Sequence, residues 1–174
     1  MDSRFARIRA WTLFLIAGLV LSGLTAFPIR LEVEAGVALL GKDLRAGGLM
    51  PDAMSSWLRT IRDAVRGASE QTPLLFYGTD WLAYGHLMIA LVFVGALRDP
   101  VRNRWLYTFG MVACALVPLW ALIFGQLRGI PFWWRGIDSM FGVVGFIPAS
   151  LCHRWTGELE REVPGRDRTG RGLR

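Results

Sequence analysis

The stretch from Trp105 to Phe124, WLYTFGMVACALVPLWALIF, decides the fold class, because no charged side chain interrupts its 20 residues. A helix needs about 20 apolar residues to cross the hydrocarbon core of a bilayer. Three other stretches approach this length, so we predict membrane-spanning helices at about residues 10–27, 79–97, 105–124 and 131–151. The sequence thus predicts an all-α, polytopic membrane four-helix bundle within residues 1–155.

The overall composition also favours a membrane protein. Hydrophobic residues make up 53% of the 174 residues, and the net charge of +6 comes from arginines clustered beside apolar runs. A nucleic-acid-binding protein would place such charge as a stripe on a polar domain, so we predict no nucleic-acid partner. The two cysteines, Cys114 and Cys152, lack metal-ligand spacing, which leaves neither a metal site nor a disulfide framework indicated.

The distribution of arginines predicts the orientation, because cytoplasmic loops carry an excess of Lys and Arg. The connection between the last two predicted helices carries only Arg128, and the long connection 28–78 is too long to have a strong influence. We therefore predict a multi-pass protein of the bacterial inner (plasma) membrane with both termini in the cytoplasm. The arginines on the predicted inner side are Arg4, Arg7, Arg9, Arg98, Arg102, Arg104, Arg154, Arg161, Arg166, Arg168, Arg171 and Arg174.

The extracytoplasmic loop 28–78 contains a helical pattern of its own. Apolar residues recur at helical spacing while charged residues take the opposite face, which predicts an amphipathic helix on the outer leaflet or capping the bundle. An upstream stretch, LEVEAGVALL, is a second, weaker helix candidate. The basic, glycine-rich segment 156–174 is predicted to be a disordered tail attracted to anionic lipid head groups. The apolar residues of the amphipathic helix predicted in the loop are Met54, Trp57, Leu58, Ile61 and Val65.

Four titratable residues fall within predicted membrane helices, where charged groups are costly and are functional candidates. Asp80 and His86 share one face of the second helix, and Arg135 and Asp138 share one face of the fourth. Both helices start outside, so these residues are predicted to form an outer polar cluster that could bind an anionic or quinone-like ligand. Its predicted aromatic rim consists of Tyr77, Tyr84, Trp133 and Trp134.

A purely structural interpretation competes with this binding site. Arg135 and Asp138 could form an internal ion pair that only fixes helix register. Haem held by two histidines of one chain is excluded, because His86 and His153 lie at different predicted depths. Pairing His86 with Met140 is conceivable, but a membrane methionine typically serves packing, so no cofactor is indicated.

Two segments carry a resemblance: LLFYGTDWLAYGHLMIALVFVGALRDPVRNRW (74–105) and RGIPFWWRGIDSMFGVVGFIPASLCHRW (128–155). With their YGTDWLA, RDPVRN and PFWWRGID motifs, they resemble a family of uncharacterised small bacterial integral membrane proteins with four helices. The resemblance implies the same four-helix topology. It implies no activity, ligand or catalytic residue.

Three functions remain open from the sequence. We favour a non-enzymatic accessory or small-ligand-binding protein whose partners are the lipid bilayer and another membrane subunit. The alternatives are a membrane enzyme or redox, quinone-binding component that uses His86 and Arg135, and an oligomeric proton-coupled carrier. No catalytic residue is assigned, because the sequence contains no hydrolase, metalloprotease, P-loop or dinucleotide fingerprint.

Overall fold

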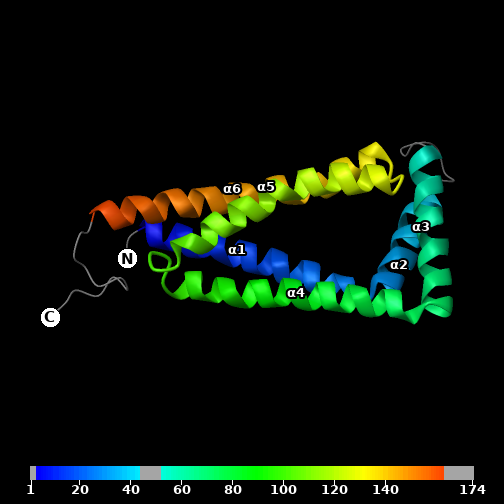
Figure 1. The fold of residues 1–174 in the computed structure, drawn as a ribbon, viewed down its shortest axis with the longest axis horizontal. Coiled ribbons are helices and arrows are strands. Elements are labelled where there is room, and N and C mark those ends of the chain that lie inside the picture. The colour runs from blue at the N-terminus through cyan, green and yellow to red at the C-terminus, as the bar shows by residue number, and fades with distance from the viewer. Residues whose placement is uncertain (1–2, 44–51, 163–174) are drawn as a thin grey trace. The chain divides into compact units, whose positions relative to one another are not determined.

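The computed structural model describes residues 3–43 and 52–162, and their regular structure is entirely helical (Figure 1). Helices α1, α4, α5 and α6 are each long and apolar enough to cross a membrane. This confirms the all-α class and the four candidate spans of a multi-pass membrane protein. The helices are α1 (Ser3–Ala26), α2 (Ile29–Asp43), α3 (Asp52–Gln71), α4 (Pro73–Arg98), α5 (Arg104–Leu127) and α6 (Phe132–Glu162).

The chain divides into two compact units, which we describe separately. Unit 1 consists of Met1–Gly18 and Ile89–Arg174, and unit 2 consists of Leu19–Met88. The division passes through α1 and α4, so each of these helices contributes to both units. The packing of the four spans into one bundle remains a prediction.

In unit 1, α5 and α6 lie against each other along their length (Figure 1). Their backbones approach closely because glycines face the contact: a Cβ at Gly142 would be 2.5 Å from the Cys114 carbonyl oxygen. A Cβ at Gly145 would similarly be 2.7 Å from the Cys114 sulfur. The small residues Gly142 and Gly145 therefore allow the close approach of α6 to α5.

Two short turns join the spans of unit 1. The first follows Arg98, where Asn103 Nδ2 donates hydrogen bonds to the carbonyl oxygens of Gly95 (3.0 Å) and Asp99 (2.9 Å). The second contains Gly129, whose φ of +69° lies in the left-handed region that favours glycine. These turns position the ends of α5.

Helix α6 continues beyond its predicted end at residue 151 and reaches Glu162. Residues 156–162, which we predicted to begin a disordered tail, are thus helical. Thr156, Gly157 and Leu159 are buried in unit 1, and this packing stabilises the extra turns. The rest of the predicted tail, 163–174, lies outside the described residues.

Unit 2 holds the loop between the first two spans, and the loop contains two helices, α2 and α3, that pack against each other. Helix α2 includes the stretch that the sequence offered as a weaker candidate. In α3 the five predicted apolar residues are half-buried. Of the charged residues on the opposite face, Arg59, Asp63 and Arg66 are exposed and Arg62 is half-buried.

Unit 2 also brings the end of α1 against α4. A Cβ at Gly23 would lie 3.0 Å from the Ala83 carbonyl oxygen and 3.2 Å from Leu87 Cγ. The spacing of Gly18 and Ser22 in the sequence predicts a small surface for close helix approach on this helix. That prediction was wrong for Gly18, because a Cβ there would meet nothing within 4 Å.

Candidate functional site

The four residues of the predicted polar cluster divide between the two units. Asp80 and His86 lie on α4 in unit 2, and Arg135 and Asp138 lie on α6 in unit 1. A single cluster of all four residues therefore stays a prediction. Each pair has its own surroundings, which are described in turn.

On α4, His86 has one ring nitrogen satisfied within the helix, because Nδ1 lies 2.8 Å from the Leu82 carbonyl oxygen. Both His86 and Asp80 are half-buried, and neighbouring Ala83 is fully buried. Asp80 makes no hydrogen bond or ion pair with any residue that the structure describes. The predicted polar face of α4 thus adjoins a packed surface.

The tyrosines predicted as a rim belong to an aromatic row on the exposed side of α4. The ring centroid of Trp81 lies 6.1 Å from that of Tyr77 and 5.7 Å from that of Tyr84, both edge to face. Sequence analysis missed Trp81, although its i+4 and i−3 spacing to the two tyrosines was a visible signal. On α6, the predicted rim residues Trp133 and Trp134 also meet edge to face, at 5.6 Å.

Arg135 does not pair with Asp138 in the structure, in contrast to the ion pair considered from the sequence. Its Nη1 instead donates to the Leu122 carbonyl oxygen on α5 at 3.3 Å, and its guanidinium lies 5.3 Å from the Phe132 ring centroid. Gly125 is the physical reason, because a Cβ there would be 2.5 Å from Arg135 Cδ. Because Gly125 has no side chain, there is space at this position for the Arg135 side chain.

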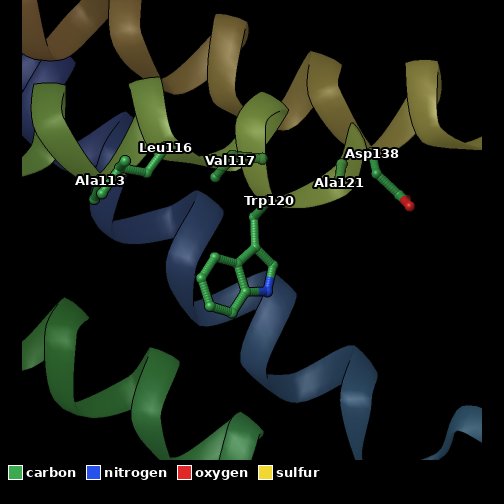
Figure 2. A pocket seen from close by; sticks show the side chains of 6 residues that line it. All are labelled: Ala113, Leu116, Val117, Trp120, Ala121 and Asp138. Carbon is green, nitrogen blue, oxygen red and sulfur yellow. The ribbon is translucent and has the colours of Figure 1, made fainter. Parts of the chain in front are cut away.

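Asp138 opens onto a groove of about 440 Å³ formed by α5 and α6 within unit 1 (Figure 2). Figure 2 shows five α5 side chains in sequence along the groove, with the Asp138 carboxylate beyond Ala121. Asp138 makes no hydrogen bond or ion pair with any described residue, and it is the groove's only charged lining residue. The α5 lining consists of Ala113, Leu116, Val117, Trp120 and Ala121.

Trp120, the aromatic residue of this groove, favours a positively charged ligand, as the Asp138 carboxylate does. The Trp120 side chain is 66% exposed, and its ring centroid lies 4.2 Å from that of Phe124. The face of an indole ring attracts cations, and an unpaired carboxylate does so more strongly. The groove therefore combines an apolar floor with two groups that favour a positively charged ligand.

The α5 lining was not identified from the sequence, although a signal was present. Positions 113, 116, 117, 120 and 121 follow the i, i+3, i+4, i+7, i+8 pattern of one helix face. In a membrane span this pattern is hidden, because the other faces are apolar as well. Only the presence of Asp138 on the neighbouring helix distinguishes this face.

Within the described ranges, no group of three or more His, Cys, Asp or Glu side chains could hold a metal ion. No protein-family model, curated protein or solved structure matches this chain. The resemblance to small bacterial membrane proteins consequently remains a prediction.

Proposed function

We propose that this multi-pass membrane protein binds a small amphiphilic cation in the α5–α6 groove, with Asp138 as the counter-ion. The supporting observation is a carboxylate without a partner among the described residues, at one end of an apolar groove within a candidate membrane span. An unpaired charge at membrane depth is costly and typically marks a ligand or ion site. A bound cation would remove that cost.

The shape of the groove suits a ligand with a charged head and an apolar tail. From Ala113 to Ala121 the lining covers eight helical steps, or about 12 Å at 1.5 Å per residue. Its volume of about 440 Å³ lies within the ordinary range of small-molecule sites. The tail would lie along α5 while the head contacts Asp138 and the Trp120 ring.

The position of Arg135 favours a cation over the anionic or quinone-like ligand suggested by the sequence. Its guanidinium already bonds to the Leu122 carbonyl oxygen and lies over Phe132. An anionic ligand would need to displace these contacts and would face Asp138 in the groove. We therefore favour a non-enzymatic binding protein over a quinone-binding enzyme.

The membrane setting of this proposal also comes from the sequence. We place the protein in a bacterial inner membrane with both termini in the cytoplasm, which the arginine distribution supports. In this orientation α2 and α3 are extracytoplasmic. Half-burial of the apolar residues of α3 and exposure of Arg59, Asp63 and Arg66 support a position of α3 at the outer leaflet.

The test is a titration of the full chain in mild detergent with decyltrimethylammonium, followed by native mass spectrometry. Asp138→Asn is expected to weaken binding about tenfold or more, because the trimethylammonium head donates no hydrogen bond and is held by its charge, and two opposite charges about 4 Å apart attract by about 1 kcal/mol in water and about 4 kcal/mol near a protein surface. Trp120→Ala is expected to weaken it about threefold or more, through loss of a cation–π contact. Decyl sulfate should not compete.

Matched controls separate the groove from general charge and aromatic effects. Asp63→Asn removes an exposed carboxylate on α3, and Trp81→Ala removes a tryptophan that is 57% exposed on α4. Both should bind the ammonium probe like the wild type. Equal binding by Asp138→Asn would refute the proposal. A third outcome is that the wild type binds no ammonium probe and the Asp138→Asn variant loses a co-purifying membrane subunit. In that case the proposal would be wrong, and the carboxylate would pair with a cationic side chain of another protein.

A further inference from the structure

One end of unit 1 gathers the start of α1, the start of α5 and the end of α6 (Figure 1). The Thr12 and Tyr107 hydroxyls lie 2.7 Å apart and join α1 to α5. Cys152 Sγ donates to the Ile8 carbonyl oxygen at 3.6 Å and joins α6 to α1. The connection from α4 to α5 belongs to the same end, which we call the arginine end.

Among the residues that the structure describes, the carboxylates at the arginine end are already engaged. Arg4 bonds to Glu162 at 2.6 Å, Arg104 to Glu160 at 3.3 Å and Arg154 to Glu158 at 3.1 Å. The remaining acid, Asp99, accepts the backbone N–H of Arg102 at 3.0 Å. Five exposed arginines at this end have no carboxylate partner among the described residues: Arg7, Arg9, Arg98, Arg102 and Arg161.

Helix length places these guanidinium groups at the surface of the membrane. The 31 residues of α6 extend about 46 Å at 1.5 Å per residue, whereas the hydrocarbon core is about 30 Å thick. The charged last turns therefore project into the head-group layer. Trp105 is 60% exposed at the same end, and the Arg7 guanidinium lies 5.0 Å from the Trp155 ring centroid. Tryptophan is enriched at this depth.

From these observations we infer that the arginine end is a binding surface for anionic phospholipid head groups. A guanidinium presents a planar fork of donors that matches two phosphate oxygens, and these five arginines have no carboxylate partner within the described chain. A lipid fits better than a soluble acidic partner because the arginines lie at head-group depth beside an exposed tryptophan. This surface is independent of the Asp138 groove.

The experiment titrates the delipidated full chain with phosphatidylglycerol or phosphatidylcholine and counts retained lipids by native mass spectrometry. We expect the wild type to prefer phosphatidylglycerol. Arg102→Gln should reduce that affinity about fivefold, and Arg98→Gln with Arg102→Gln about twenty-five-fold, because each arginine of a basic cluster at the membrane surface contributes about 1 kcal/mol toward anionic lipid. The affinity for phosphatidylcholine should change less than twofold.

Arg128→Gln is the matched control. Arg128 is also exposed in a short connection of unit 1, but it lies between α5 and α6 and not at the arginine end. It should change the affinity for phosphatidylglycerol less than twofold. An equal loss in Arg128→Gln and Arg102→Gln would overturn the inference by showing a general charge effect, and so would a wild type without preference between the two lipids. A circular dichroism spectrum checks that each variant is folded.

Discussion

Replacing Gly142 by alanine is expected to lower the free energy of unfolding by about 3 kcal/mol, because the new methyl group has no space. A Cβ at Gly142 would lie 2.5 Å from the Cys114 carbonyl oxygen and 2.9 Å from Pro118 Cδ. Neither atom is the flexible end of a side chain, so α5 and α6 must separate. Packing between membrane helices depends on such close approach, and the separation would weaken contacts along both helices.

Gly136→Ala is the control for this substitution, since Gly136 lies on the same helix and a Cβ there would meet nothing within 4 Å. Alanine is also the better helix former, so this variant should be unchanged or slightly more stable. Both variants can be compared by unfolding in mixed detergent micelles with circular dichroism detection. If Gly142→Ala were as stable as Gly136→Ala, close packing of α5 on α6 would not stabilise the protein.

The sequence was sufficient for the membrane-spanning elements, because their signal is local. The 20-residue run at 105–124 became α5 at Arg104–Leu127, with the ends displaced by one and three residues. Apolar length fixes such a helix without reference to any neighbour. The helical pattern in the loop likewise predicted α3.

The ends and contacts of helices were less predictable, because they depend on packing against neighbouring helices. Nothing in the local pattern distinguishes Gly18 from Gly23, yet only Gly23 lies against another helix. The extra turns of α6 depend on burial of Leu159 and Thr156 within unit 1. Tertiary packing of this kind extends a helix beyond the limit of its apolar run.

The candidate site shows the same division between local and tertiary information. Spacing on one helix suggested that Arg135 would pair with Asp138, but a gap at Gly125 on the next helix gives the arginine another partner. The sequence indicated Asp138 as a candidate, because a charged residue within a membrane helix is rare and costly. It could not show that Asp138 lines an apolar groove, because five of the six lining residues belong to α5.

Because Tyr107 joins α1 to α5, Tyr107→Ala is expected to lower the free energy of unfolding by about 3–4 kcal/mol. The Tyr107 side chain is 0% exposed, its hydroxyl lies 2.7 Å from Thr12 Oγ1, and its ring meets Phe93 edge to face. Removal of the Tyr107 side chain would leave a cavity and would break the hydrogen bond to the Thr12 hydroxyl. The same unfolding assay provides the measurement.

Tyr107→Phe separates the two contributions to that loss. It keeps the ring and removes only the bond to Thr12, so it should cost about 1–1.5 kcal/mol. Thr12→Val combined with Tyr107→Phe should cost less than the sum of the single variants, because both remove one shared hydrogen bond. Tyr77→Ala is the surface control: this tyrosine is 56% exposed, and its loss should change stability by less than about 0.5 kcal/mol. Comparable losses for Tyr77→Ala and Tyr107→Ala would contradict the proposed role of the buried ring in joining α1 to α5.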